Sequence, residues 1–258
     1  MRTRLWRDFC PLQNLSLSDS PAYNCRVTDN LPKTQISLDD MLRRTSWAQA
    51  LSADDYARAR EGMTERLVPS GGYVCHKGEP VEHWHGVIDG LVKMSSDWAT
   101  GKTASFTGIA AGGWFGEGSM LKPEPRRYDV VALRDSRVAC MRRDTFHWLL
   151  DNSIAFNRFV INQLNERLGL FIGLLESERL LDVDARVART LAALFHPVLQ
   201  PGIEARITIS QEELGYLAGV SRQRVNKALR LLEDEGFLTT QYGGVTVLNL
   251  DALRRFGS

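Results

Sequence analysis

The sequence predicts an α+β protein in which a small β-barrel precedes a long helix and a compact C-terminal module. The barrel is predicted from short β-rich runs, broken by glycine, between Leu67 and Met141. The long helix is predicted from an apolar residue at every seventh position from Ile154, and the module from two capped helical segments and a hairpin after Ser210. These changes of pattern divide the chain into an extension, a barrel domain, a long helix and a C-terminal domain, over residues 1–36, 37–143, 144–180 and 181–258.

The composition is that of a folded protein. Of the 258 residues, 43% are hydrophobic and 24% are charged, which is the usual range for a soluble domain. The sequence contains no apolar run of the ~20 residues that span a bilayer, and its start, MRTRLWRDF, lacks the apolar core of a signal peptide. We therefore expect a cytoplasmic protein without a membrane partner. Because the net charge is only +1, any contact with nucleic acid must come from a local basic surface.

The elements before the long helix follow from local patterns. Residues 1–36 are rich in Ser, Asn, Pro and Asp, which predicts an extension to which we assign no function. From Ser37 to about Gly62, the spacing of apolar residues predicts one or two short amphipathic helices, with Ser52 as a cap. The later strands follow one another without helix-length segments between them, which favours an antiparallel sandwich or closed barrel.

The long helix carries two apolar stripes. Its heptad seam consists of Ile154, Ile161, Leu164, Leu168, Phe171 and Leu175. The second stripe, Phe156, Phe159, Val160, Leu170 and Leu174, is suited to face the chain's own barrel. A helix with two apolar faces needs two partners, so we expect the seam to form a homodimer interface. The alternative is a helix buried within a single chain.

The C-terminal module has the pattern of a winged helix-turn-helix. Ser210 and Glu213 form a capping box, and Ser221 caps a second helix after a tight turn. A hairpin with Gly243-Gly244 at its tip follows and predicts a wing. We expect the second helix to expose an acid-free face that binds double-stranded DNA together with the two caps; this face consists of Arg222, Gln223, Arg224, Asn226, Lys227 and Arg230.

Two stretches resemble the cyclic-AMP receptor / fumarate-nitrate regulator (CRP/FNR) family. SQEELGYLAGVSRQRVNKALRLLEDEGFL is similar to its DNA-binding end, and WFGEGSMLKPEPRRYDVVALRDSRVACM to its phosphate-binding cassette. The resemblance implies a cyclic-nucleotide-binding-type barrel of the jelly-roll (double-stranded β-helix) kind, a two-fold symmetric DNA site, and RNA polymerase as a partner. It also implies that Gly116 and Glu117 bind the sugar of an effector and that Arg127 pairs with its phosphate.

Three bulky residues depart from the pattern of cyclic-AMP binders. Tyr128, Phe171 and Ile172 stand where the resemblance implies small hydroxyl residues. Their bulk removes hydrogen-bond donors and narrows the space, so we expect an effector other than cyclic AMP, such as a larger nucleotide or an aromatic molecule against Tyr128 and Phe171. The alternatives are an internal Glu117–Arg127 ion pair and a regulator that needs no effector.

A cupin-like metalloenzyme with a DNA-binding tail is the alternative from another class. His83 and His85 have the H-x-H spacing of a cupin metal site, and Asp89 could add a carboxylate. The ligand that a later strand should supply is missing, because the next histidine after His85 is His147. The four cysteines also lack the C-x-x-C spacing of metal sites. We therefore expect no metal, no cofactor and no catalytic residues, and a regulator rather than an enzyme.

Overall fold

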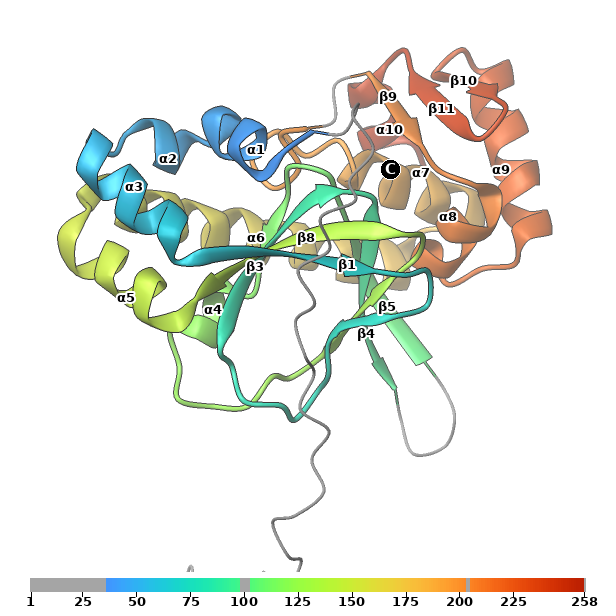
Figure 1. The fold of residues 1–258 in the computed structure, drawn as a ribbon. Helices are drawn as coiled ribbons and strands as arrows, with labels where there is room; N and C mark the ends of the chain where they lie inside the picture. The colour runs from blue at the N-terminus through green and yellow to red at the C-terminus, as the bar shows by residue number, and fades with distance from the viewer. Residues whose placement is uncertain (1–35, 98–102, 203–204, 258) are drawn as a thin grey trace, which may run out of the picture.

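The computed structural model describes residues 36–97, 103–202 and 205–257, and Figure 1 shows their arrangement. A β-rich body lies between a group of N-terminal helices and a C-terminal module, and one long helix runs behind the body (Figure 1). The expected extension and two of the four cysteines, Cys10 and Cys25, lie outside the described residues. Among the helices that are described, none is long and apolar enough to cross a membrane.

Three short helices, rather than the one or two expected, precede the barrel. They are α1 (Leu38–Arg44), α2 (Ser46–Gln49) and α3 (Ala53–Glu61). Ser37 begins α1 with a capping box, and Ser52 caps α3 by accepting a hydrogen bond from the backbone N–H of Asp55. Thr45 separates α1 from α2 because its backbone is extended there.

The barrel is an eight-stranded jelly roll of two antiparallel four-stranded sheets, which confirms the predicted fold class. The first sheet has the order β1 (Met63–Val68), β8 (Ser136–Arg142), β3 (His83–Asp89), β6 (Trp114–Phe115). The second has the order β2 (Tyr73–Cys75), β7 (Asp129–Ala132), β4 (Leu91–Asp97), β5 (Thr103–Ala110). A short helix, α4 (Glu117–Met120), follows β6.

An aromatic cluster joins the first sheet to the helices. Trp84 on β3 stacks on Trp114 with 4.2 Å between ring centroids, and Phe146 and Phe156 meet Trp84 edge-on. Trp47 of α2 packs against the same rings, and all five side chains are buried. Such contacts add to the burial of apolar surface, so the helices are fixed on the barrel.

The predicted long helix is interrupted. Its first part is α5 (Arg143–Asn152), and the second is α6 (Ile154–Leu180). The break falls at Ser153, which has an extended backbone and caps α6 by accepting a hydrogen bond from the backbone N–H of Phe156. Phe156 and Val160 of α6 are buried in the aromatic cluster, as the second apolar stripe predicted.

The C-terminal module comprises four helices and a three-stranded sheet. The helices are α7 (Val183–Ala193), α8 (Gln211–Ala218), α9 (Arg222–Asp234) and α10 (Leu250–Arg255). The sheet has the order β10 (Leu238–Gln241), β11 (Gly244–Val247), β9 (Arg206–Thr208). A core that includes Leu191, Leu214, Val225 and Leu229 holds the module together.

Gly90 provides a test of the barrel's packing. It joins β3 to β4 with φ of +104°, and a Cβ there would lie 2.3 Å from Oγ of Ser136. Gly71 also has a positive φ, of +78°, but no atom lies within 4 Å of its Cβ position. We expect Gly90→Ala to lower the free energy of unfolding by about 2–4 kcal/mol, through backbone strain and overpacking. Gly71→Ala should cost only about 1 kcal/mol. Equal losses in denaturant unfolding would contradict this packing.

Candidate functional site

The two helices α8 and α9 and the turn between them form a helix-turn-helix. Ser210 begins α8 with the predicted capping box to Glu213, and Gly219 ends it in the left-handed region with φ of +66°. Ser221 then caps α9 by accepting a hydrogen bond from the backbone N–H of Arg224. The two predicted caps are thus confirmed, and they fix the start of α9 against α8.

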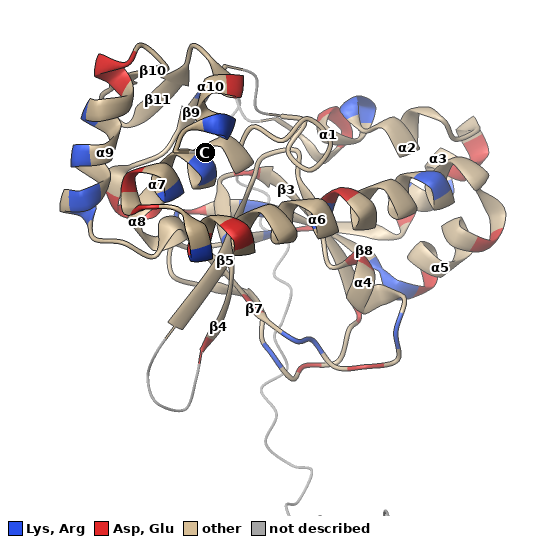
Figure 2. Cartoon of the chain, turned by 180° about the vertical axis from the view of Figure 1, so that it is seen from behind, with Lys and Arg blue, Asp and Glu red and all other residues tan. Residues whose placement is uncertain are grey.

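The outer face of α9 is basic and polar. Figure 2 shows successive basic positions along this helix at the edge of the molecule. Arg222, Gln223, Lys227 and Arg230 are exposed, whereas Val225, Ala228, Leu229 and Leu232 are buried. No acidic residue occurs in α9 before Glu233, so positive charge dominates its N-terminal half.

Two residues of the expected face are not exposed. Arg224 is half-buried and pairs with Asp184 of α7 at 3.3 Å. Asn226 is also half-buried, and its side-chain oxygen accepts a hydrogen bond from Gln211 of α8 at 3.3 Å. The expectation that both are exposed is wrong, because helix geometry turns them toward α7 and α8.

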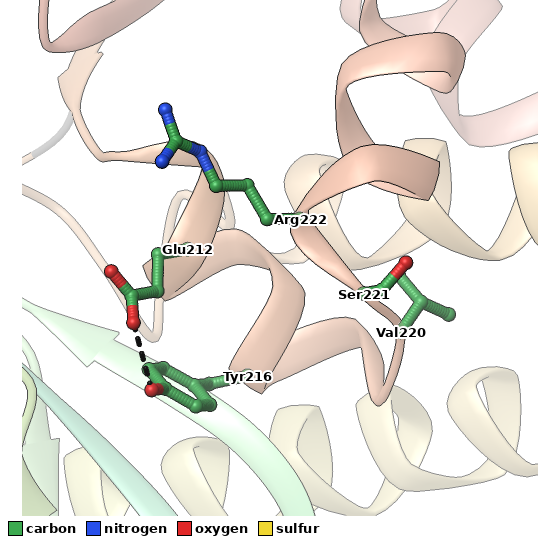
Figure 3. A pocket seen from close by; sticks show the side chains of 5 residues that line it. All are labelled: Glu212, Tyr216, Val220, Ser221 and Arg222. Atoms are coloured by element: carbon green, nitrogen blue, oxygen red, sulfur yellow. Dashed lines mark hydrogen bonds between the residues drawn. The ribbon is translucent and has the colours of Figure 1, made fainter.

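A surface hollow of about 300 Å³ lies where α8 meets the start of α9. Its lining residues are Glu212, Tyr216, Val220, Ser221 and Arg222 (Figure 3). Glu212, Tyr216 and Arg222 extend on one side of the hollow, with the turn residues Val220 and Ser221 on the other. The Tyr216 hydroxyl donates to Glu212 at 3.0 Å, and this bond together with the Glu212 charge raises the pKa of Tyr216. The start of α9 therefore borders a concave surface with both polar and apolar lining.

The hairpin after α9 has the position predicted for a wing. β10 and β11 pair in register from Leu238↔Val247 to Gln241↔Gly244, so Tyr242 and Gly243 form the tip, one residue before the Gly243-Gly244 pair that we expected there. Tyr242 is fully exposed. Glu233 near the end of α9 accepts hydrogen bonds from the backbone N–H and the hydroxyl of Thr240, at 2.7 and 2.8 Å. This carboxylate fixes the wing relative to α9.

One face of α6 carries a line of apolar residues that the rest of the described chain leaves exposed. Ile154, Ile161, Leu168 and Leu175 are 72%, 66%, 61% and 48% exposed, and α6 crosses the front of the molecule in Figure 2. Leu164 and Phe171, which we expected on the same seam, instead pack half-buried against the chain's own cores. The exposed apolar line on α6 thus consists of the four residues that recur at every seventh position.

Inside the barrel the buried arginine is Arg126, not Arg127. Arg126 is 3% exposed and donates from Nη2 to the carbonyl of His83 at 2.6 Å and to Nδ1 of His85 at 3.3 Å. Arg127 has a 73% exposed side chain and pairs with Glu124. The expectation that Arg127 points into the barrel is therefore wrong by one residue. Local sequence does not distinguish the two, because both arginines lie in the irregular segment before β7.

The buried carboxylate of Glu117 pairs with a residue that sequence reasoning missed. Arg167 of α6 donates from Nε to Glu117 at 2.7 Å and from Nη2 to the carbonyl of Trp114 at 2.7 Å. The alternative of a Glu117–Arg127 ion pair is therefore also wrong. Glu117 is 1% exposed, and its Oε2 is buried without a hydrogen-bond partner among the described residues.

Two of the three bulky residues face the barrel. Tyr128 and Phe171 are half-buried and pack against its interior cluster. Burial raises the pKa of Tyr128, and the nearby Glu117 charge acts in the same direction. Ile172 is 51% exposed and lies on the outer side of α6, so it does not close the barrel as expected.

The turn between β6 and α4 approaches Arg126 closely. Gly116 begins α4 with φ of +93°, and a Cβ there would lie 3.0 Å from Nη1 of Arg126. This Nη1 is buried and lacks a hydrogen-bond partner within the described part of the chain. Gly116, Glu117, Arg126 and Tyr128 thus gather at one point inside the barrel, whereas Arg127 does not join them.

Both histidines of the H-x-H pattern accept hydrogen bonds from Arg126, His83 through its backbone carbonyl and His85 through its ring. Burial lowers the pKa of His85 well below its usual value of 6.5, and the charge of Arg126 acts in the same direction. The neutral ring stacks on Phe115 with 5.4 Å between centroids, and its Nδ1 accepts from Arg126 because a guanidinium can only donate. In the described ranges, no group of three His, Cys, Asp or Glu residues is arranged to hold a metal ion.

Two family profiles match the chain. The cyclic nucleotide-binding domain matches residues 65–153, and the Crp-like helix-turn-helix domain matches residues 185–256. The CRP-like cAMP-activated global transcriptional regulator of Mycobacterium tuberculosis is 28% identical over 222 residues, which cover 84% of this chain and 99% of the relative. The cyclic AMP receptor protein of Thermus thermophilus is 26% identical over 200 residues, covering 76% and 89%.

Solved structures share the fold. FixK2 from Bradyrhizobium japonicum superposes with a TM-score of 0.62 at 18% identity, over 76% of this chain and 98% of that one. The c-di-GMP responsive global regulator CLP from Xanthomonas campestris gives a TM-score of 0.54 at 21% identity, over 76% and 99%. At these identities the likeness shows the architecture of barrel, long helix and helix-turn-helix.

Proposed function

Because the chain belongs to the CRP/FNR family of transcription regulators, we propose that it reads a two-fold symmetric DNA site as a homodimer under the control of a small effector other than cyclic AMP. The observation that carries this proposal is the exposed, acid-free face at the start of α9. RNA polymerase, the further partner implied by the family, stays a prediction, as does a form that needs no effector.

Three side chains of α9 are suited to read bases. Arg222, Gln223 and Lys227 are exposed, and none forms a hydrogen bond or ion pair with another described residue. Arg binds the major-groove edge of guanine through two hydrogen bonds, Gln brackets adenine, and Lys reaches guanine or phosphate. The capped N-terminal end of the second helix is the part that enters the groove in such motifs. Arg230, one turn farther along, is placed for phosphate.

Arg222→Ala should weaken binding to the preferred site by about 1–3 kcal/mol and relax the preference at one guanine in each half-site. A binding selection over randomised DNA measures both effects. Arg230→Ala is the matched control, because loss of a phosphate contact weakens all sequences about equally. An unchanged base preference in the Arg222→Ala protein would contradict the assignment of α9 as the reading helix.

The uncovered seam of α6 supports a homodimer. Four large apolar residues at seven-residue spacing are exposed along one side, while the other side is buried against the barrel. A contiguous apolar line of this kind marks an interaction surface, and a second copy presents the same line. Pairing of two copies would give the two reading helices the two-fold symmetry that a symmetric site requires.

Leu168→Asp should convert the protein to a monomer. The substitution would bury a carboxylate in the centre of the seam, which costs several kcal/mol unless the two helices separate. Sedimentation velocity measures the change, and affinity for a two-fold site should fall with it. Asn162→Asp is the matched control, because it adds the same charge at an exposed polar position of α6. A Leu168→Asp protein that stays dimeric would place the interface elsewhere.

The interior of the barrel supports an anionic effector. Arg126 is buried without a carboxylate partner among the described residues, and a buried unpaired charge is costly. An anionic group bound at Nη1 would relieve that cost, and Oε2 of Glu117 could accept a hydrogen bond from the same molecule. The Mycobacterium tuberculosis relative is cAMP-activated and CLP is c-di-GMP responsive, and both effectors carry phosphate. Tyr128 and Phe171 occupy interior space, which disfavours cyclic AMP itself.

Calorimetry with cyclic AMP should show no binding at micromolar concentration, and the nucleotide should leave operator affinity unchanged. Steric conflict with Tyr128 and unpaired ligand groups outweigh the roughly 1.5–3 kcal/mol that a charged hydrogen bond from Arg126 supplies. A screen of other anionic nucleotides should find a ligand whose binding is lost in Arg126→Ala and kept in Arg127→Ala. Micromolar binding of cyclic AMP that Arg126→Ala abolishes would contradict the proposed exclusion.

A further inference from the structure

The C-terminal module is docked on one edge of the barrel. Its core cluster also contains Leu91 and Ala110, which belong to strands β4 and β5. Leu194 and Leu217 lie over Gly108 of β5 so closely that a Cβ there would come within 3 Å of both side chains. Apolar surface from the two parts therefore forms one continuous core.

A glutamine closes the edge strand of the barrel. Strand β5 is the last strand of its sheet, and such an edge offers unpaired backbone groups. Gln200 is 2% exposed; it donates to the carbonyl of Gly108 and accepts from the N–H of Ala110, both at 2.7 Å. The segment between α7 and β9 is thus fixed to β5 as a further strand residue would be.

An arginine of the barrel holds the first helix of the helix-turn-helix. Arg134 follows β7 and donates from Nε and Nη2 to the two carboxylate oxygens of Glu213, at 2.7 and 2.6 Å. The side chains are 28% and 12% exposed, so the pair is largely shielded from water. Oε2 of Glu213 also accepts from the N–H of Ser210, so the carboxylate that caps α8 is the one that Arg134 holds. Lys93 of β4 lies over the ring of Tyr216 at 5.5 Å and adds a second contact.

The same short strand connects this ion pair to the effector site. Arg126 precedes β7 and Arg134 follows it, so four strand residues and their neighbours separate the buried arginine from the one that holds α8. The reading residues Arg222, Gln223 and Lys227 remain exposed in the docked arrangement. Docking therefore leaves α9 free to meet DNA.

We propose that Arg134 is a positioning residue for DNA binding. Its paired hydrogen bonds to Glu213 hold α8, and with it the reading helix, at a fixed orientation to the barrel and to the dimer helix α6. In a dimer, this fixes the distance and angle between the two reading helices, so that the protein selects one half-site spacing. The inference rests on the homodimeric DNA-binding function proposed above.

The experiment compares full-length wild-type protein with Arg134→Ala on a panel of DNAs. Each DNA carries the same two half-sites, with a centre-to-centre distance stepped in single base pairs around one and two helical turns, about 10 and 20 base pairs. Wild-type protein should prefer one spacing. Arg134→Ala should lose about tenfold in affinity at that spacing and little at the others, because a charged hydrogen-bonded pair is lost and the modules become free to rotate. The profile should therefore flatten.

The controls separate positioning from stability. Arg142→Ala removes an exposed ion pair with Asp144 on the barrel, away from the module, and should leave the profile unchanged. Arg134→Lys keeps the charge but not the two-pronged geometry, so its profile should lie between those of wild type and Arg134→Ala. An equal loss at every spacing would mean that Arg134 serves stability alone and would overturn the inference. Tighter binding of Arg134→Ala at all spacings would also overturn it, since docking would then oppose DNA binding.

A second measurement does not depend on DNA. Hydrogen exchange of the Ala110 amide reports docking, because that N–H donates to Gln200 of the module segment. It should be faster in Arg134→Ala and unchanged in Arg142→Ala. If wild-type protein bound single half-sites as well as paired ones, the proposed dimeric function would fail. Faster Ala110 exchange in Arg134→Ala would then still support Arg134 as the residue that holds the module, and unchanged exchange would overturn that too.

Discussion

The long helix α6 is the constraint on which the rest of the molecule depends. Its N-terminal half buries Phe156 and Val160 in the aromatic cluster, so it cannot leave the barrel without exposing that core. Farther along, Gln163 donates to the carbonyl of Val198 and Arg167 pairs with Glu117. One element therefore contacts both the barrel interior and the segment between α7 and β9 of the C-terminal module. With its inner face buried in this way, α6 leaves the four residues of the seven-residue seam exposed in the single chain, and this exposed line is the basis for the proposed homodimer.

Stability alone does not explain the charges buried inside the barrel. A buried ion pair between Glu117 and Arg167 contributes little net stability, because the cost of desolvation offsets the attraction. Arg126 beside it adds a second cation, whose acceptors within the described part of the chain are the neutral ring of His85 and a backbone carbonyl, with no carboxylate. A protein selected for stability alone would place apolar side chains there. The site has one carboxylate and two guanidinium groups, and Oε2 of Glu117 and Nη1 of Arg126 have no hydrogen-bond partner among the described residues. These atoms are the basis for the anionic effector proposed above.

Periodicity and capping were sufficient to predict the architecture, and they failed where single residues had to be oriented. Ser210, Ser221 and the apolar positions of α8 and α9 are determined by local rules, so the helix-turn-helix was predictable to the residue. Arg126 and Arg127 are chemically identical neighbours in the loop before β7, and the tertiary path of that loop decides which of them is inside. The resemblance placed the arginine one position too late. Arg224 and Asn226 were misjudged because their partners, Asp184 and Gln211, are brought close by tertiary packing. Arg167 could not be found from local sequence at all, since 50 residues separate it from Glu117.

The polar side chains of α9 fall into two groups, those that pack within the module and those that stay exposed. Arg224 and Asn226 are used within the module, so the orientation of α9 against α7 and α8 is fixed by side chains of the reading helix itself. Arg222, Gln223 and Lys227 are exposed and form no hydrogen bond or ion pair with the described residues, which fits the base-reading role proposed for them. A reading helix gains specificity when its backbone is held rigidly while its outer side chains stay unsatisfied, because a mismatched base then leaves donors without partners. The wing is held to the same helix through Glu233 and Thr240, so α9 and the wing form one connected surface.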